Sequence, residues 1–498
     1  MSLKTHDIAI IGTGFAGLGA AIRLQQEGFS DFVLLEKSDE VGGTWRDNTY
    51  PGCACDVQSH LYSFSFEPNP DWSRMFARQP EILDYLKHCA RKYHLYPKVR
   101  FHTEVTGASW DEDAAVWTVS GPDGAILRAR KLVSGMGGLS RPAYPQIKGL
   151  ENFQGQTFHS QQWNHDYPLS GKRVAVIGTG ASAIQFVPQI AGRVARLDLY
   201  QRTPPWILPK PDRAIRAAER TLFRLVPRAQ EAIRNALYWQ FEARAAGFVV
   251  NPRIMKLPER WARSHIRNQI PDRALRRRVT PDYTIGCKRI LISNDYYPAL
   301  TRDNVNLLTD GIREITATGI IDTQGVEREV DAIIFGTGFA ATDPIGTMRI
   351  TGRDGRDLKE TVTAKPEAYL GTTIAGFPNL FFLTGPNTGL GHNSLIYMIE
   401  SQVEYLLQAF GHMREQGLRA IEVREKVQDR FNAGLRSKLG KAVWSAGGCR
   451  SWYLDEQGRN ITLWPDFTWR FRQMTARFRS ADYAIDTGRW REPLPRAA

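Results

Sequence analysis

The hydrophobic positions of this chain fall twice into the same order: a short apolar run, a glycine cluster, and a stretch with helical periodicity. The apolar runs cover residues 7–11 and 174–177 and are short enough to be buried strands. The helical stretches cover residues 18–27 and 183–190. Strand, glycine turn and helix in this order are the repeating unit of doubly wound sheets. The pattern therefore predicts an α/β fold with two Rossmann-like dinucleotide-binding domains.

Both glycine clusters have the spacing of a phosphate-binding loop. The first is Gly12-Thr13-Gly14-Phe15-Ala16-Gly17, and the second is Gly178-Thr179-Gly180-Ala181-Ser182-Ala183. Glycines let the backbone approach a pyrophosphate that is held at a helix N-terminus. The last position sets the distance between helix and strand, so alanine is tolerated there. One such match often marks only a tight turn, but two copies with strand and helix in place predict two nucleotide sites.

The residues that end the next two apolar runs carry opposite charges. Glu36 follows Gly12 by 24 residues, and Arg202 follows Gly178 by the same 24 residues. A carboxylate at this place can accept a hydrogen bond from a free ribose 2'-hydroxyl, whereas a guanidinium suits a 2'-phosphate. The first site is therefore predicted to take FAD or NAD, and the second NADP.

Length and composition limit the classes of protein to which this chain can belong. The chain has 498 residues, of which 42% are hydrophobic, enough for about three globular domains by the usual length per domain. It contains no apolar run of the ~18 residues that a membrane span needs, and the first strand begins at Asp7, which leaves no room for a signal peptide. We therefore expect a cytoplasmic protein with no integral membrane segment.

The five cysteines are few, odd in number and scattered, so no disulfide framework is expected. Cys53-Ala54-Cys55 could suggest a metal site. No second cysteine or histidine pair lies at ligand spacing, however, so we interpret these two residues as small loop residues and predict no metal.

Positive charge gathers in one segment of the chain. The formal net charge is +13, and residues 212–280 hold sixteen Arg or Lys against six Asp or Glu. Binding of nucleic acid or of a membrane surface is one interpretation, and the solvated face of amphipathic helices is the other. No nucleic-acid motif accompanies the charge, so we favour the second interpretation and expect no nucleic-acid partner.

A family resemblance is carried by several motifs. Phe153-x-Gly155-x-x-x-His159-x-x-x-Trp163 resembles the signature of Baeyer–Villiger monooxygenases, flavoenzymes that insert oxygen beside a ketone carbonyl. Further motifs of the family match at Gly42-Gly43-Thr44-Trp45, at Tyr50-Pro51-Gly52 with Asp56, and at Gly336-Thr337-Gly338. The resemblance runs from Asp7 to about Trp464, and residues 50–66 look most like the aryl-ketone (4-hydroxyacetophenone monooxygenase-like) branch.

This resemblance implies a function and an organisation. It implies an FAD-containing, NADPH-dependent monooxygenase that converts ketones to esters or lactones with O2 through a C4a-peroxyflavin, and that also oxidises sulfides. The alternatives are a flavin-containing monooxygenase that oxidises nitrogen or sulfur, and a redox sensor without turnover. We expect residues 1–148 to form the first part of the FAD domain and 149–375 the NADP domain, with a helical insertion at about 210–283. Residues 376–498 then form the second part of the FAD domain and the C-terminal segment.

The chemistry of this family needs a fixed positive charge, because an anionic peroxide and then an anionic adduct must be stabilised. Lys288-Arg289 matches the Lys-Arg pair of the family. The resemblance makes Arg289 the stabilising cation, since guanidinium stays protonated and planar. It makes Asp56 the residue that hydrogen-bonds and orients Arg289, and it places Lys288 at the 2'-phosphate with Arg202 and Thr203.

Other residues are assigned to the cofactors by motif position. The FAD site is expected to include Gly12, Gly14, Gly17, Glu36, Lys37, Thr44, Trp45, Asp56 and Tyr62, and the NADP site Gly178, Gly180, Ser182, Arg202, Thr203, Lys288 and Trp452. Trp452 resembles a loop tryptophan that closes over NADP, with simple packing as the alternative. His159 and Trp163 precede the second nucleotide fold, so we favour a structural or hinge role over proton transfer. Gly391-His392-Asn393-Ser394 precedes a helix whose N-terminus either seats the flavin or packs the core.

Overall fold

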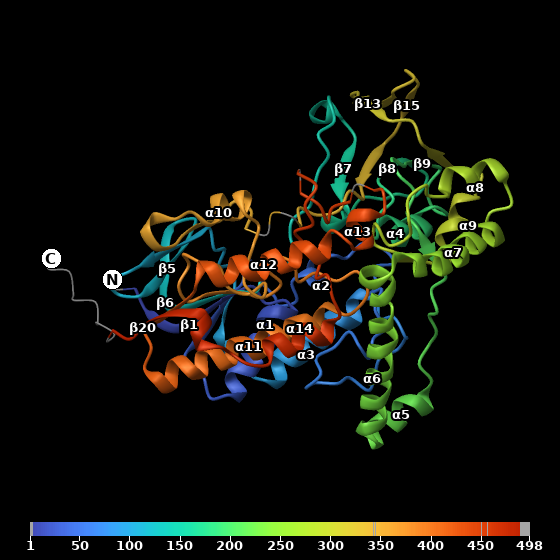
Figure 1. The fold of residues 1–498 in the computed structure, drawn as a ribbon. Helices are drawn as coiled ribbons and strands as arrows, with labels where there is room; N and C mark the ends of the chain where they lie inside the picture. The colour runs from blue at the N-terminus through green and yellow to red at the C-terminus, as the bar shows by residue number, and fades with distance from the viewer. Residues whose placement is uncertain (1–2, 342, 344, 450, 456, 489–498) are drawn as a thin grey trace.

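The computed structural model describes residues 3–341, 343, 345–449, 451–455 and 457–488. Two large β-sheets with helices packed against them form two units, which lie at the left and at the upper right of Figure 1. The first glycine cluster belongs to the first sheet and the second cluster to the other.

The first sheet is built around a central strand, β1, whose last four residues are all apolar. Its order is β17-β4-β5-β6-β1-β2-β3, and β18 also pairs with β6. Strand β1 is parallel to both of its neighbours, which explains why residues 8–11 are apolar without alternation: both faces of the strand are covered. The strands are β1 (Thr5–Ile11), β2 (Phe32–Leu35), β3 (Val99–Arg100), β4 (Gly107–Asp111), β5 (Val116–Gly121), β6 (Gly124–Ser134), β17 (Arg349–Thr351) and β18 (Leu380–Phe382).

The second sheet is wholly parallel and has the order β12-β9-β8-β16-β7. Its strands are β7 (Gln156–His159), β8 (Arg173–Ile177), β9 (Arg196–Tyr200), β12 (Val305–Leu308) and β16 (Ala332–Phe335). Small antiparallel or two-stranded sheets are formed by β13 (Ile312–Ile315), β14 (Gly319–Asp322) and β15 (Glu327–Glu329), by β10 (Ile207–Leu208) and β11 (Leu291–Ile292), and by β19 (Ala420–Val423) and β20 (Tyr483–Asp486).

Each predicted nucleotide unit has its helix directly after the glycine cluster. Helix α1 (Phe15–Gln26) begins three residues before the expected start, because Gly14 already serves as its N-cap, and α4 (Ala183–Ile190) has the expected bounds. The other helices outside the insertion are α2 (Thr44–Asp47), α3 (Gln79–Lys92), α9 (Tyr296–Leu300), α10 (Leu358–Ala364), α11 (Leu395–Gln416), α12 (Glu425–Leu439), α13 (Val443–Ala446) and α14 (Thr468–Thr475).

The basic segment is helical, as predicted. It contains α5 (Ala217–Leu225), α6 (Pro227–Ala243), α7 (Lys256–Gln269) and α8 (Arg273–Val279), with the short turns η4 (Ala246–Val250) and η5 (Pro252–Met255) before α7. Helices α5 and α6 descend along the right side of Figure 1 and end in a free tip, away from both sheets.

Two chain segments cross between the units side by side. Pro142 forms a bridge with Phe339, the Ala143 amide donates to the Gly338 carbonyl at 2.9 Å, and the Thr337 hydroxyl donates to the Ala143 carbonyl at 2.6 Å. After the second crossing, β17 pairs with β4 of the first sheet. The chain has therefore returned to the first unit by residue 349, earlier than the expected bound at residue 375, because this short strand is too brief to show a periodic pattern.

Candidate functional site

The first glycine loop lies against a second glycine pair. Gly12 has a φ of +92°, which favours glycine, and a Cβ on Gly17 would come within 1.9 Å of the Gly12 carbonyl oxygen. A Cβ on Gly43 would come within 3.0 Å of the Gly14 Cα atom. The loop that opens α1 and the loop that opens α2, where Thr44 is the first residue, thus meet with bare backbone. This is the cradle that a pyrophosphate needs.

Glu36 lies beside this loop, as the spacing predicts. Its buried carboxylate accepts hydrogen bonds from the Thr13 amide at 3.2 Å and the Thr13 hydroxyl at 2.6 Å, and it forms an ion pair with Arg46 at 2.9 Å. These bonds fix the carboxylate beside the loop. Lys37 is exposed.

Two aromatic residues assigned to the FAD site are in contact. The Trp45 indole N–H donates to the Tyr62 hydroxyl at 3.2 Å, and the two rings meet edge to face at 5.6 Å. Burial raises the pKa of Tyr62, so its hydroxyl stays protonated. The pair forms a rigid, neutral wall beside the first loop.

The second glycine loop lies against the third family motif. Gly178 has a φ of +105°, and a Cβ there would come within 2.5 Å of the Gly336 carbonyl oxygen. Gly180 faces the same carbonyl, and Ser182 is the N-cap of α4. Gly336 of the motif Gly336-Thr337-Gly338 therefore lies where two loops approach each other closely, whereas Gly338 has a φ of +84°, which favours glycine.

Arg202 and Lys288 come together beyond the end of β9. Arg202 is exposed and Lys288 half-buried, and burial followed by the Arg202 charge lowers the pKa of Lys288. Among the described residues neither side chain has an ion-pair partner. The Thr203 carbonyl accepts from the Thr179 hydroxyl at 3.3 Å, which ties this corner to the glycine loop. Two converging cations, with the exposed Asp282 as the acid that acts on Lys288, leave net positive charge for a dianion such as a phosphate.

Arg289 and Asp56 form the expected hydrogen-bonded pair. The Arg289 Nε and Nη2 atoms each donate to one Asp56 carboxylate oxygen at 2.8 Å, which fixes the guanidinium plane. The Asp56 charge raises the pKa of Arg289 against the opposing effect of burial. About a third of each side chain remains accessible, 35% for Arg289 and 28% for Asp56. The pair is thus a fixed cation that a reacting group can still reach.

The loop that carries Asp56 is held by the second unit. Gln185 on α4 donates to the Ala54 carbonyl at 3.0 Å and accepts from the Tyr50 hydroxyl at 2.9 Å. Burial raises the pKa of the neighbouring Cys53 thiol to about 12, so the thiol stays protonated. Sequence reasoning missed Gln185, since nothing in a glutamine on a predicted helix points to a loop 131 residues away.

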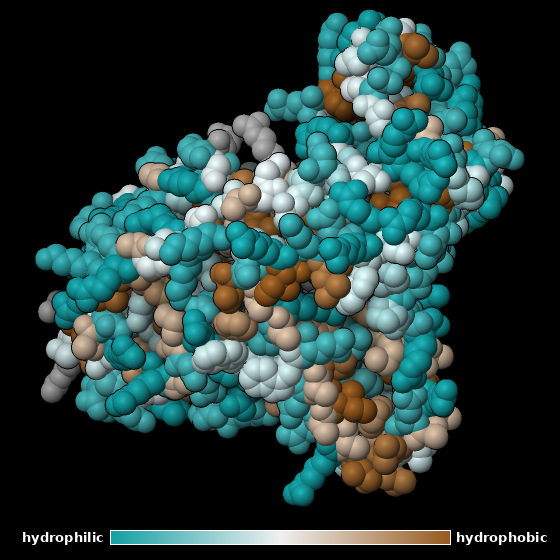
Figure 2. All heavy atoms as spheres, turned by 45° about the vertical axis from the view of Figure 1, so that its right-hand side comes forward, coloured by the Kyte–Doolittle hydropathy of each residue, from teal (hydrophilic) through white to brown (hydrophobic). Residues whose placement is uncertain are grey.

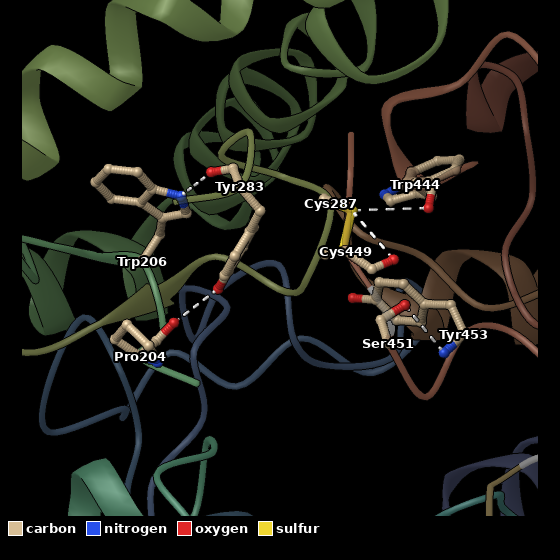
Figure 3. The surroundings of a disulfide bond; sticks show 8 residues. All are labelled: Pro204, Trp206, Tyr283, Cys287, Trp444, Cys449, Ser451 and Tyr453. Carbon is tan, nitrogen blue, oxygen red and sulfur yellow. Dashed lines mark hydrogen bonds between the residues drawn. A yellow bond between two sulfur atoms is a disulfide. The ribbon is translucent and has the colours of Figure 1, made fainter. Parts of the chain in front are cut away.

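A disulfide corrects the expectation for the cysteines. Cys287, directly before Lys288, is bonded to Cys449 across 162 residues, as Figure 3 shows. Cys53, Cys55 and Cys89 are free and buried. The pairing was missed because these two cysteines have no motif spacing and only the fold brings them together. The bond joins the segment that carries Arg289 to the C-terminal loop.

The C-terminal loop places Tyr453, rather than Trp452, toward Arg289. Tyr453 is buried, and its pKa is raised to about 12 by burial, with the Arg289 charge opposing the rise. Trp452 is 45% exposed, and its ring lies against that of Tyr453 at 4.5 Å. In this structure, Trp452 therefore lies on the surface of the loop.

His159 lies where the chain crosses between the units, and Trp163 packs in the core against Phe186 of α4. His159 is buried, its Nδ1 accepts from the Gln161 amide at 3.1 Å, and its ring contacts Tyr144 and Phe339 of the two crossing segments. Burial lowers the pKa of His159 to about 4, so the ring is neutral. These contacts support the predicted structural role.

A buried carboxylate from the insertion secures the N-terminus of α11. Glu242 on α6 accepts from the Asn393 amide group at 2.7 Å and from the Thr468 hydroxyl at 2.7 Å. Burial would raise the pKa of Glu242, but the interaction with His392, followed by these two bonds, outweighs burial and lowers it. The Asn393 side chain in turn accepts from the Ser394 amide at 2.8 Å. Ser394 is the N-cap, as expected, but its own side chain forms no cap bond. Glu242 carried no signal in the sequence, where it is one acid among many arginines.

Over the described ranges, none of the helices is both long and apolar enough to cross a membrane. Within the same ranges, no group of three His, Cys, Asp or Glu residues could hold a metal ion.

Two glycine loops, one beside a carboxylate and one beside paired cations, define a protein that binds two dinucleotides. Residues 5–348 match the family model described as FMO-like, flavin-binding monooxygenase-like. A Baeyer-Villiger monooxygenase of Pseudomonas aeruginosa is 61% identical over 481 residues, covering 96% of this chain and 91% of the relative. Oxidized steroid monooxygenase bound to NADP is 31% identical with a TM-score of 0.87, covering 97% of this chain and 100% of that chain.

The OTEMO complex with FAD and NADP also has a TM-score of 0.87, at 26% identity, and covers 97% of this chain and 100% of that chain. The chain therefore belongs to the flavin-binding monooxygenase-like family and, within it, to the Baeyer–Villiger monooxygenases. This confirms the predicted family and the predicted α/β fold with two Rossmann-like domains.

Proposed function

We propose that this chain is an FAD-containing, NADPH-dependent Baeyer–Villiger monooxygenase that converts ketones to esters or lactones with O2. The observation that carries the proposal is the fixed pair of Arg289 and Asp56, in which Arg289 directly follows Lys288 of the second cation site. A heteroatom-oxidising flavin enzyme has no need of such an oriented, accessible cation, whereas an anionic adduct does. The family and its solved members are consistent with both cofactors.

The residues fit the two dinucleotides. Gly12, Gly14 and Gly43 leave bare backbone for the FAD pyrophosphate, and the Thr13 bonds hold Glu36 toward the ribose. The FAD group, when bound, supplies the electrons that activate O2 for insertion beside the carbonyl. Arg202 and Lys288 bind the 2'-phosphate of NADP, and Trp452 closes over the coenzyme when the loop folds inward.

Arg289 then stabilises negative charge that develops on the oxygen atoms of the ketone adduct. Its guanidinium acts without giving up a proton, because the Asp56 charge raises its pKa. Asp56 contributes orientation rather than contact with substrate. We also propose that sulfides are oxidised, that aryl ketones are the preferred class, and that the location is cytoplasmic. The FAD domain comprises residues 1–148 and, from residue 349 onward, the remaining chain.

The test separates reduction from oxygen insertion. Arg289→Ala should still bind FAD, but ester formation should fall about 10²- to 10³-fold, the usual cost of one preorganised charge donor. Asp56→Ala should lower ester formation less, because the charge itself remains. Stopped-flow reduction by NADPH and quantified ester and sulfoxide give the readouts. Ester formation by Arg289→Ala at the rate of the unmodified enzyme would refute the role.

A further inference from the structure

The helical insertion exposes an unusual share of the large hydrophobic side chains. Among the described residues, eight of the fourteen exposed large hydrophobics lie between residues 222 and 261. Three of them, Leu222, Leu225 and Val226, form the apolar tip of α5 and α6 at the lower edge of Figure 2. Four others follow one another along η4, η5 and α7. Such a concentration on one small element marks an interaction surface rather than scattered exposure.

The four exposed hydrophobic residues along η4, η5 and α7 form a surface that we call the α7 face. Its apolar members are Val250 at 65% exposure, Ile254 at 48%, Leu257 at 50% and Trp261 at 59%. The spacing of four, three and four residues places the last three on one side of the continuous η5 and α7 helix. Met255, Ala262 and Ile266 point to the opposite side and are buried in the core. The helix is therefore already anchored, and its apolar row faces outward.

A row of cations runs beside this apolar row. Arg253, Lys256 and Arg260 are exposed and each lies next in sequence to a member of the α7 face. Within the described part of the chain, none of the three has an ion-pair partner. The nearby acid Glu259 is paired with Arg263 at 2.8 Å, so it does not neutralise the row. The outward half of the helix thus consists of an apolar row and an unneutralised basic row.

We propose that the α7 face docks on an anionic lipid bilayer surface. Apolar side chains with a tryptophan enter the headgroup boundary, while adjacent Lys and Arg side chains reach the anionic headgroups, which is the arrangement of interfacial amphipathic helices. A second copy of the chain fits this face less well, because a twofold contact would bring two basic rows together. Nucleic acid would neutralise the basic row but leave Ile254, Leu257 and Trp261 uncovered.

The apolar tip of α5 and α6 can be compared with the α7 face, since both are exposed parts of the same insertion. It is also apolar and exposed, but its Arg224 is paired with Asp71 at 2.5 Å. Among residues 222–231 this leaves Arg228 as the one exposed cation outside an ion pair, against three on the α7 face, and Glu231 on α6 is exposed nearby. Charge complementarity therefore favours the α7 face over the tip as the element that meets anionic lipid. Leu225→Ser at the tip serves as the matched control, because it removes a leucine that is even more exposed than Leu257, 76% against 50%, without touching the α7 face.

The experiment is co-sedimentation of the FAD-loaded enzyme with vesicles of phosphatidylglycerol and phosphatidylcholine in equal parts, and with pure phosphatidylcholine. We expect binding to the mixed vesicles only, with loss at high salt. Lys256→Gln with Arg260→Gln should lower partitioning about 30-fold, since each basic residue near the surface contributes about 1 kcal/mol. Leu257→Ser with Trp261→Ser should lower it at least about tenfold, because the buried apolar area is lost. NADPH oxidation with a soluble ketone should be unchanged in all variants.

Three outcomes would overturn the proposal. In the first, the parent enzyme does not bind the mixed vesicles. In the second, the α7 variants bind these vesicles as well as the parent does. In the third, only Leu225→Ser loses binding to them. Analytical ultracentrifugation tests the competing occupant: a parent dimer that becomes a monomer in the Trp261→Ser variant would assign the face to a second copy. A parent that binds single-stranded DNA in place of the vesicles, with Lys256→Gln and Arg260→Gln abolishing that binding, would assign it to nucleic acid.

Discussion

Replacement of Arg202 tests the second nucleotide site most sharply. Arg202 and Lys288 converge, and among the described residues neither is held in an ion pair, so both are available to a 2'-phosphate. A hydrogen bond to a charged group contributes about 1.5–3 kcal/mol, which corresponds to a rise in KM for NADPH of about tenfold to more than a hundredfold in Arg202→Ala. We expect the lower end of this range, because Arg202 is exposed and because its removal also relieves the repulsion on Lys288.

NADH provides the comparison, since it lacks the 2'-phosphate. Its KM should be nearly unchanged in Arg202→Ala, so the ratio of the two coenzymes is the measured quantity in steady-state NAD(P)H oxidation with a fixed ketone. Arg193→Ala is the matched control, because Arg193 is also exposed but precedes β9 at the opposite end of the sheet. An Arg202→Ala enzyme with the parent ratio of NADPH to NADH would refute the assignment.

Two further predictions concern the segment around residue 288. Because burial and Arg202 lower the pKa of Lys288, its positive charge is lost as pH rises before an ordinary lysine would lose it. The KM for NADPH should therefore increase on the alkaline side, and Lys288→Arg should remove this increase; a pH profile that is identical in both enzymes would contradict it. Thiol titration of the denatured, unreduced protein should find three free thiols, and five would show that Cys287 and Cys449 are not bonded.

Much of the fold could be predicted because its signals are local. The apolar runs at residues 7–11 and 174–177 became β1 and β8, and the glycine clusters became the turns before α1 and α4. A buried parallel strand needs apolar residues at every position, and a phosphate loop needs glycine at fixed intervals, so both leave a mark in a short window.

The remaining features depend on contacts between distant residues. The link between Cys287 and Cys449 arises only when the C-terminal loop folds over the second unit. Glu242 is buried by Asn393 and Thr468, and no neighbouring residue in the sequence distinguishes it from the solvated acids of the insertion. The chain returns to the first sheet at β17, which pairs with β4. A strand of three residues is too short to show a periodic pattern in the sequence.

The pair of Arg289 and Asp56 combines both situations: each residue lies in a local motif, but the contact joins distant parts of the chain. The two residues are 233 positions apart, and only their place in two family motifs suggested the contact that the structure shows. The charge alone would have assigned Arg289 to the surface of a basic protein. The structure adds what the motifs could not provide, namely that Gln185 of the second unit fixes the loop before Asp56.

Product analysis after incubation with NADPH and isotopically labelled O2 tests the central claim most directly. Aryl, cyclic and linear ketones and a thioether are supplied separately, and products are identified by mass spectrometry. The account predicts an ester or lactone that contains one labelled oxygen atom, with one NADPH consumed for each product molecule. Formation of labelled sulfoxide without ester from any ketone would contradict it and would favour a heteroatom-oxidising enzyme.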